Sequence, residues 1–451
     1  MKWFLALSML LSAARVAPAQ SEQITLDPSR TAQTIQGWGG HVYPQVNAYL
    51  TSDSLFLQRM IYELYTTDMR VRSVWYLLEA QNDNLDPDLI NWEAIAGGDT
   101  GLVHEELLLQ QVLHERGVRL YFAAWRFPYW MVGKPHDWRP RPDEKPELPP
   151  SMEAEFIESI VSYLIYARDR YGILFEGISV ANEPDIGIYI SGLTPERLLR
   201  LTRDLKRRLE REAYNTQYYM PDVAAADSIG QAYTESFFQL PGSGDLTCSV
   251  SYHTYRRELD VIRFFAETGR RLDLPVWAME QSHTHLAVPD RHEWSHALAN
   301  AVCLHDILVY GDVSLSLYWS YAMSSSGGLG LYIPERKEWA PAYDMLKHFQ
   351  NHLPRGSQRI ACEPDSTETG IRSVAFLLPD RSTITLVLIN TAEVSRRVSL
   401  NLKGGSVTIQ QIFQSDRTRR HEPLPVGPIN EDGTSLTLPP GSVSTVRLKQ
   451  N

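Results

Sequence analysis

The sequence predicts an α/β protein, a (β/α)8 TIM barrel with a C-terminal antiparallel β-sandwich side domain. Short apolar runs alternate with amphipathic helical patterns from about residue 36 to 353, which is the order of a parallel barrel. After about residue 356 the helical period disappears, and alternating runs follow between Gly, Pro, Asn and Asp, as in a sandwich. No Gly-rich dinucleotide turn follows an early run, which argues against a doubly wound sheet.

Eight runs qualify as barrel strands because each is short, apolar and bounded by turn residues. They are residues 35–42, 69–74, 119–124, 177–181, 218–223, 248–253, 276–280 and 314–319. Helical patterns, with apolar residues three and four apart, include 102–116, 152–170, 195–212, 294–310 and 341–353. A long proline-rich loop, 126–150, follows the third strand and is expected on the active-site face of the barrel.

The expected domains are a barrel over residues 36–355 and a β-sandwich over residues 356–451. The sandwich strands are predicted at 373–378, 382–390, 397–402, 406–413, 435–438 and 443–448. Residues 20–35 also have strand character and are expected to join the sandwich from the other end of the chain. No Gly/Ser- or Pro-rich linker separates the two domains, so we expect them to pack together.

Residues 1–19 have the pattern of a secretory signal peptide, with a lysine, the apolar run 3–11 and Ala17-Pro18-Ala19 before the expected cleavage site. We therefore exclude them from the fold and expect a secreted or periplasmic protein. No later segment reaches the roughly 20 apolar residues of a membrane span. The oligomeric state stays open.

The composition of the chain limits the kinds of partner that it can bind. Its 451 residues are 43% hydrophobic, and its formal net charge is −11, which argues against nucleic acid because nucleic-acid binding depends on clustered Lys and Arg. Three cysteines are too few for a disulfide scaffold, and whether two of them pair stays open. A neutral ligand suits this surface best, and a polysaccharide or oligosaccharide is a ligand of this kind.

Two glutamates stand at the carboxyl ends of predicted strands. Glu183 follows the apolar run 177–181 within Asn182-Glu183-Pro184, and Glu280 ends the run 276–280. Barrel enzymes hold their catalytic groups at this end of the strands. Cleavage of a glycosidic bond needs one carboxylic acid to protonate the leaving oxygen and one carboxylate on the opposite face of the sugar. The pair therefore predicts a glycosidase.

Several motifs, taken in their order, resemble glycoside hydrolase family 30, in the retaining clan of barrel glycosidases. They are the runs Gln36-Gly37-Trp38-Gly39-Gly40, Trp125-Arg126-Phe127-Pro128-Tyr129-Trp130-Met131, Asn182-Glu183-Pro184 and His253-Thr254-Tyr255, with Glu280 and Trp319. The resemblance covers nearly all of the chain after the signal. Where family members usually have serine and proline in the motif after the third strand, this chain has Arg126, Phe127 and Tyr129, which leaves the substrate open.

The resemblance implies roles for individual residues. Glu183 is expected to be the acid/base and Glu280 the nucleophile, without a cofactor or metal. The substrate-binding residues are expected to be Asn182 at the sugar 2-hydroxyl, Tyr255 as a donor to Glu280, His253, Arg72 near the nucleophile, and Trp125, Trp130 and Trp319 as platforms for sugar rings.

The expected reaction is hydrolysis of a β-linked polysaccharide, with xylan as the first candidate. Endo-β-1,6-galactanase or glucanase activity and exo-acting β-glycosidase activity are the alternatives. A non-catalytic carbohydrate-binding barrel is a different class of function, and both glutamates together with Asn182 argue against it. His283 and His285 have a spacing that a metal could use, but no third ligand is evident near them in the sequence.

Overall fold

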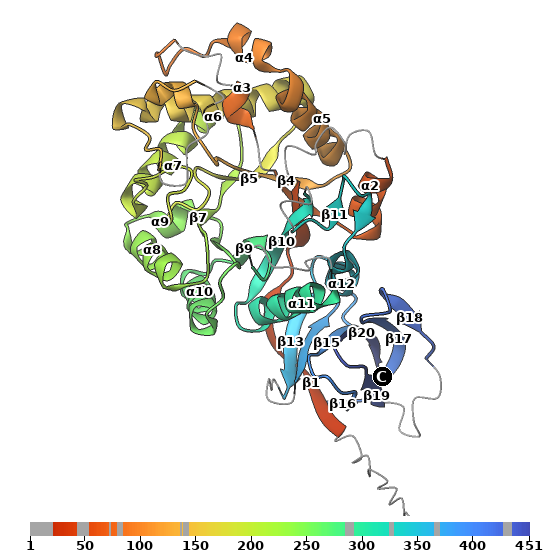
Figure 1. Ribbon diagram of the computed structural model, residues 1–451. Helices are drawn as coiled ribbons and strands as arrows, with labels where there is room; N and C mark the ends of the chain where they lie inside the picture. Colours follow the sequence, from red (N-terminus) through yellow and green to blue (C-terminus); the bar gives the residue numbers. More distant parts are fainter. Residues whose placement is uncertain are drawn as a thin grey trace, which may run out of the picture.

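The computed structural model describes residues 21–42, 54–71, 74–78, 84–135, 138, 144–284, 293–323, 329–364, 370–426 and 435–451. The expected signal, residues 1–19, lies outside them. A barrel and a smaller β-domain stand next to each other, in contact through the helices α11 and α12 (Figure 1). None of the helices in the described part of the chain has the length and apolar character that a membrane span requires.

The barrel is a ring of parallel strands in chain order, as predicted. Its strands are β2 (Gly37–Val42), β3 (Asp68–Val71), β4 (Arg119–Ala123), β5 (Phe175–Ser179), β6 (Gln217–Tyr218), β7 (Met220–Val223), β8 (Val250–His253), β9 (Val276–Gln281) and β10 (Val313–Ala322). Strands β6 and β7 are two pieces of the fifth strand, pairing with β5 and β8 respectively. Strand β10 pairs with β2. Each of the eight predicted runs therefore supplies one position of the ring.

Helices follow the strands around the outside of the barrel (Figure 1). The longer ones are α5 (Gly101–Glu115), α6 (Glu153–Tyr171), α7 (Pro195–Arg211), α8 (Ser228–Gln239), α10 (Leu259–Leu272), α11 (Trp294–Val309) and α12 (Pro341–Gln350). The shorter elements are α2 (Ser54–Gln58), η2 (Arg59–Glu63), α3 (Trp75–Leu78), α4 (Trp92–Gly98), η4 (Tyr129–Val132), η5 (Pro150–Met152), α9 (Ser243–Leu246) and the small strands β11 (Tyr332–Ile333) and β12 (Glu338–Trp339). The five predicted helical patterns correspond to α5, α6, α7, α11 and α12.

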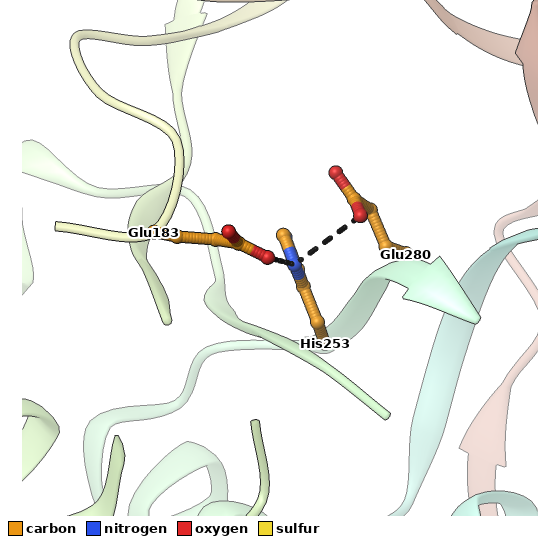
Figure 2. A group of neighbouring side chains, drawn as sticks. All are labelled: Glu183, His253 and Glu280. Atoms are coloured by element: carbon orange, nitrogen blue, oxygen red, sulfur yellow. Dashed lines mark hydrogen bonds and ion pairs between the residues drawn. The ribbon is translucent and has the colours of Figure 1, made fainter. Parts of the chain in front are cut away.

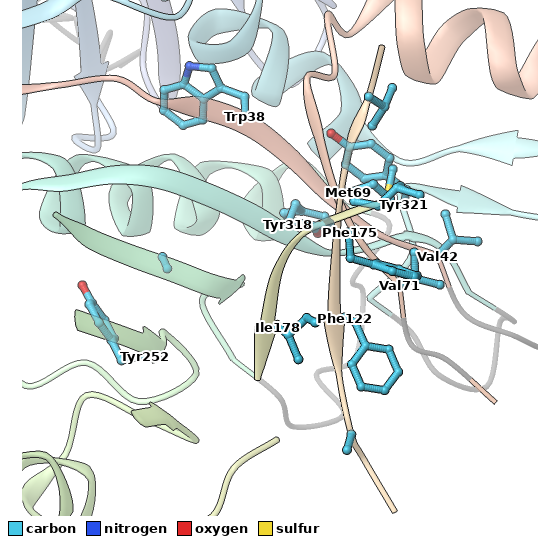
Figure 3. Close-up of a cluster of buried hydrophobic side chains, with 14 of the residues drawn as sticks. Trp38, Val42, Met69, Val71, Phe122, Phe175, Ile178, Tyr252, Tyr318 and Tyr321 are labelled. Carbon is cyan, nitrogen blue, oxygen red and sulfur yellow. The ribbon is translucent and has the colours of Figure 1, made fainter. Parts of the chain in front are cut away.

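The barrel strands are buried on both faces, and their side chains alternate between two cores. In β4, Leu120 and Phe122 point to the helices, while Tyr121 and Ala123 belong to the cluster inside the barrel. Figure 3 shows Phe122 among the side chains of the outer core. Because other side chains cover both faces of such a strand, its consecutive residues are apolar. This explains why they could be located from the sequence.

The glycine-rich first strand is explained by the close approach of its neighbour. A Cβ atom at Gly39 would lie 1.5 Å from the carbonyl oxygen of Asp68, and one at Gly37 would lie 1.8 Å from Oδ2 of the same residue. Since neither position leaves room for a side chain, the backbone of β2 can pack directly on Asp68. Asp68 is itself buried at the start of β3. It forms an ion pair with Arg119 at the start of β4.

The second domain is one continuous sheet that folds around its own core. Its strands are β1 (Ser21–Thr34), β13 (Gln358–Glu363), β14 (Ile371–Leu377), β15 (Thr383–Asn390), β16 (Arg396–Leu402), β17 (Val407–Ser415), β18 (Glu422–Leu424), β19 (Ser435–Leu438) and β20 (Ser442–Gln450). Their order is β18-β17-β20-β15-β14-β13-β1-β16-β19. All pairs are antiparallel except β1 with β16, which run parallel. The N-terminal strand thus lies inside this sheet, between β13 and β16.

Barrel and β-sandwich share buried surface through strand β15. Leu386 and Leu388 belong to the core of the sandwich, whereas Val387 and Ile389 belong to the core that includes the barrel helices. Successive side chains of a strand point to opposite faces, so β15 is buried from both sides. Arg372 on β14 adds an ion pair with Asp306 on α11 at 2.6 Å. The sandwich is therefore a fixed part of the molecule.

A cluster of three histidines lies in the same interface. The ring nitrogens of His348 on α12 lie 2.8 Å from the hydroxyl oxygens of Thr445 and of Ser415, and His352 Nε2 lies 2.9 Å from His421 Nε2. Burial lowers the pKa of His348 well below its usual range, that of His352 to about 4 and that of His421 to about 3. The positive charges of Lys347 and Arg447 act in the same direction. These rings are therefore neutral in the folded protein near neutral pH.

We expect this cluster to make stability fall in acid. A histidine with a depressed folded-state pKa contributes stability above its unfolded pKa of about 6.5, which is lost as the pH falls towards the folded value. For His352 alone the loss between pH 7 and pH 4 is about 3 kcal/mol. Urea unfolding at pH 7, 6, 5 and 4 measures it. In the His352→Gln variant, the free energy of unfolding should decrease less as the pH falls. The control is His104→Gln, which removes a half-exposed imidazole on α5 and should leave the decrease unchanged. An equal pH dependence of the wild type and both variants would contradict the expectation.

Candidate active site

The strand ends bring the expected catalytic residues together. Glu183 follows β5, Glu280 lies in β9, and His253 ends β8 between them (Figure 2). One carboxylate oxygen of each glutamate and one ring nitrogen of His253 all lie within 4.8 Å of one another. Since the strands are parallel, their carboxyl ends meet at one face of the barrel. The two glutamates, 97 positions apart in the sequence, thus form one site.

Glu183 is held by a backbone that is unusual for its residue type. Its φ is +52°, in the left-handed region that non-glycine residues seldom occupy; active sites are one of the places where such backbone strain gathers. Its amide donates to the carbonyl of Asp222 at 3.1 Å, while the amide of Asn182 donates to the carbonyl of Ala124 at 2.9 Å. These bonds tie the loop after β5 to both neighbouring strands. The Glu183 side chain is 8% exposed, so it can reach a ligand in the cavity.

Glu280 is almost fully buried and receives several polar contacts. Tyr255 donates from its hydroxyl to Oε2 at 2.5 Å, and Arg70 Nη1 donates to Oε1 at 3.3 Å. Burial raises the pKa of Glu280 to about 7, although His253, Arg70 and the Tyr255 hydroxyl all lower it. These three groups therefore oppose the effect of burial and favour the ionised carboxylate of Glu280. The donation from Tyr255 is the contact that the family resemblance implied.

His253 is placed between the two glutamates. Its Nδ1 lies 3.0 Å from Glu183 Oε1 and 3.5 Å from Glu280 Oε2, while Nε2 lies 3.2 Å from Asp222 Oδ1. Although burial lowers the pKa of His253, the three carboxylates raise it to about 10. A protonated ring donates hydrogen bonds and has no lone pair for a metal. The trio has enough ligand atoms for a cation, but the charge on His253 disfavours one.

Arg70, on β3, takes the position that the sequence analysis assigned to Arg72. Its Nη2 donates to Asn182 Oδ1 at 2.5 Å and to Asp222 Oδ2 at 2.7 Å, and its side chain is completely buried. Arg72 lies outside the described residues. Because side chains two positions apart in a strand face the same side, the alternation could not distinguish position 70 from position 72, and the register of β3 with β2 and β4 was not available from the sequence. The arginine that the structure places beside Glu280 is Arg70.

Asp222 is a further site residue that the sequence analysis did not identify. It lies in β7 with a φ of +62° and accepts hydrogen bonds from Arg70 and His253. Asp185, two residues after Glu183, also faces this region, since its Oδ1 accepts from the amide of Ala224 at 2.9 Å. Burial raises the pKa of Asp185 to about 7. Both are acidic residues close to strand ends, which was the only sequence signal for them.

Two of the three predicted tryptophan platforms lie at the site. Trp125 and Trp319 stack with ring centroids 5.4 Å apart and an interplanar angle of 22°, and both line the cavity that contains the glutamates. Trp130 is partly buried, packs against the hydrophobic core of the barrel, and is not among the described residues that line this cavity. Because Trp130 lies near the start of the loop after β4, the sequence predicted it in the binding cleft. In the structure, the 3₁₀ turn η4 places its side chain against the core.

Of the two histidines after Glu280, the structure describes His283. Its Nε2 lies 2.8 Å from His296 Nδ1 on α11, and His285 lies outside the described residues. Cys248 and Cys303 are free thiols, and Cys362 Sγ lies 3.1 Å from Ser373 Oγ. The cavity around Glu183 and Glu280 measures about 490 Å³, which is within the usual range for small-molecule sites.

Comparison with known proteins follows the same division of the chain. Residues 356–446 match the model of the glycosyl hydrolase family 30 beta sandwich domain. The lysosomal acid glucosylceramidase of Mus musculus is 22% identical over 423 residues, which are 82% of this chain and 78% of the mouse protein. These matches confirm the resemblance to glycoside hydrolase family 30 that the motifs indicated. The barrel, the β-sandwich and the strand-end glutamates agree with it.

Solved structures share the fold of this glycoside hydrolase over nearly its full length. A glycoside hydrolase family 30 subfamily 8 xylanase from Clostridium acetobutylicum has a TM-score of 0.74 and 17% identity, covering 95% of this chain and 100% of the other. An endo-β1,6-glucanase has a TM-score of 0.65 and 16% identity, covering 96% of this chain and 95% of the other. Such identities establish the fold, so the substrate has to be inferred from the site itself.

Tyr255→Phe tests the role of the tyrosine hydroxyl. Because the hydroxyl lowers the pKa of Glu280, its removal raises that pKa, and a higher pH is then needed to ionise the nucleophile. We expect the acidic limb of the kcat/KM profile to move up by about one pH unit, which is the effect of a charge-assisted hydrogen bond. Tyr252→Phe is the control, because the Tyr252 hydroxyl is buried in β8 without a hydrogen-bond partner among the described residues. Identical profiles for both variants would refute the role.

Proposed function

We propose that the protein is a secreted, retaining β-glycoside hydrolase with Glu183 as acid/base and Glu280 as nucleophile. The observation that carries the proposal is that a carboxylate oxygen of each glutamate lies within 4.8 Å of the other. Retaining enzymes have carboxyl groups about 5–5.5 Å apart, whereas inverting enzymes need about 6.5–9.5 Å to admit a water molecule. The close pair favours direct attack by Glu280.

The reaction has two steps that use the same groups in turn. In the first, a Glu280 oxygen attacks the anomeric carbon, the bond to the leaving oxygen breaks, and Glu183 gives its proton to that oxygen. In the second, the Glu183 carboxylate takes a proton from water, and the water oxygen displaces Glu280. Two inversions give net retention. Asn182, held by Arg70, is placed to bond the sugar 2-hydroxyl.

For the natural substrate, we propose a β-linked polysaccharide, with xylan first. The resemblance to family 30 and the similarity of the fold to a xylanase support xylan, and the similarity to an endo-β1,6-glucanase supports β-1,6-linked galactan or glucan as the alternative. Exo-action on a terminal sugar is the third candidate. Incubation with xylan, β-1,6-galactan and β-1,6-glucan, followed by sizing of the products, separates them. Only a ladder of short oligosaccharides from xylan supports our first choice.

The Glu280→Ala variant tests the nucleophile. We expect it to lose nearly all activity on aryl β-glycosides and to regain part of it with azide, which can occupy the vacated space while Glu183 still acts. Azide then attacks from the face opposite to the leaving group, so the product is an α-glycosyl azide. Glu176→Ala is the control, because Glu176 lies in β5 near Arg119 at the opposite end of the barrel. NMR detection of a first-formed sugar with inverted configuration in the wild type would exclude the mechanism.

The Glu183→Ala variant tests the acid/base. Natural glycans and alkyl glycosides, which have poor leaving groups, should lose about 10²–10⁴-fold in rate. Dinitrophenyl glycosides need little protonation and should lose far less in the first step. Equal losses for both kinds of leaving group would remove Glu183 from this role.

A further inference from the structure

A second cavity, the interface cavity, lies where the barrel meets the β-sandwich. Its walls include residues 65–67 before β3, the end of α12 with the residues after it, and Leu378 and Arg447 of the sandwich. Residues before a strand lie at the amino end of the barrel, whereas Glu183 and Glu280 lie at the carboxyl end. The cavity measures about 300 Å³, which is enough for a small molecule. No described residue lines both this cavity and the active site.

Several polar side chains of the interface cavity are hydrogen-bonded within the protein. The Tyr321 hydroxyl lies 3.0 Å from Thr66 Oγ1 and donates to Gln350 Oε1 at 3.2 Å. The Thr67 hydroxyl donates to the carbonyl of Trp38 at 3.2 Å, and the Trp38 indole donates to the carbonyl of residue 353 at 2.7 Å. These groups are thus engaged without a ligand.

Two other residues of this cavity each have a buried polar atom without a hydrogen-bond partner in the described part of the chain. The atoms are Oδ1 of Asn351, an acceptor, and Nε of Arg447, a donor. Asn351 is held in its orientation because its Nδ2 donates to the carbonyl of Glu63 at 2.7 Å. Since buried polar groups are nearly always hydrogen-bonded, these atoms indicate a ligand that offers an acceptor to Arg447 and a donor to Asn351.

The interface cavity is also positively charged. Arg355 and Arg447 both line it, and its described lining residues include no aspartate or glutamate. Arg355 Nε donates to the carbonyl of Gln36 at 2.8 Å, which fixes its guanidinium. Asp68 attracts Arg355 but is itself paired with Arg119. Because guanidinium groups bind carboxylates and phosphates with directed hydrogen bonds, two of them at one cavity fit an anion.

We propose that the interface cavity binds a small hydroxylated anion, a sugar phosphate or a sugar acid, which connects the barrel to the sandwich. The acidic group of the ligand accepts hydrogen bonds from Arg447 and Arg355, and one of its hydroxyl groups donates to Asn351 Oδ1. Tyr65 lines the same cavity and is 60% exposed, so solvent reaches the cavity at this side. The inference concerns binding alone and does not depend on the proposed hydrolysis.

Titration calorimetry of the full protein with glucose 6-phosphate and with gluconate, at constant ionic strength, tests the proposal. Glucose is the probe with hydroxyl groups and no charge, and acetate is the probe with charge and no hydroxyl group. We expect glucose to bind at least tenfold and acetate about fivefold more weakly than the better of the two hydroxylated anions, since hydrogen bonds to charged groups are the stronger ones. That better ligand identifies the acidic group as phosphate or carboxylate.

The melting temperature provides a second measurement. A ligand that binds only the folded protein stabilises it in proportion to the logarithm of its concentration. At a concentration about 100 times its Kd, the better ligand should raise the Tm by about 3 °C. Glucose at the same concentration should leave the Tm nearly unchanged.

The Arg447→Gln variant locates the site. It removes the charge and should weaken binding of the hydroxylated anion at least tenfold. The matched control is Arg396→Gln, because Arg396 lies on β16 of the same sandwich and also has a buried Nε without a partner among the described residues, but does not line the cavity. This control should bind like the wild type. A cooperative thermal transition without ligand shows that both variants are folded.

The outcomes are distinct from those that test the proposed function, because none of these measurements involves hydrolysis. Tight binding that is lost in Arg447→Gln and kept in Arg396→Gln supports the anion site. Equal affinities for glucose, acetate and the hydroxylated anions would overturn it. So would an unchanged Kd in Arg447→Gln, which would place the ligand elsewhere, the active site included, or an equal loss in both variants, which would reflect net charge alone.

Discussion

The buried guanidinium of Arg70 is the charge on which the arrangement of the active site depends. Its side chain is completely buried, and an ion in such a place costs several kcal/mol unless its hydrogen bonds are satisfied. Asp222, Glu280 and Asn182 accept hydrogen bonds from its two terminal nitrogens, and they come from three other strands or strand ends. The folded barrel thereby holds Glu280 and Asn182 at one centre.

The charged groups of this centre act on one another at short range. Arg70 and His253 are in contact with three carboxyl groups, those of Asp222, Glu183 and Glu280. The three carboxyl groups raise the pKa of His253, while His253 and Arg70 lower the pKa of Glu280 against the effect of its burial. The charge of Glu280 therefore depends on neighbours that come from other strands of the barrel.

The rest of the molecule supports this centre through shared buried surfaces. Strands of the barrel carry the inner cluster on one face and the helix-facing core on the other, and β15 of the sandwich is buried in the same way. Because protein interiors are close-packed, side chains of the sandwich contact α11 and α12 directly and support their positions. The N-terminal strand β1, between β13 and β16, closes the sandwich with a segment from the opposite end of the chain.

The sequence by itself determined the barrel, the sandwich and the two strand-end glutamates, because strands buried on both faces read as apolar runs and because their carboxyl ends meet at one face. It could not determine the register of β3, so the arginine beside Glu280 was assigned to Arg72 in place of Arg70. Nor could it show that Trp130 turns towards the core, or that Asp222 completes the charge network. Only the tertiary structure decided these points, since each depends on which side chains from distant strands share one buried space.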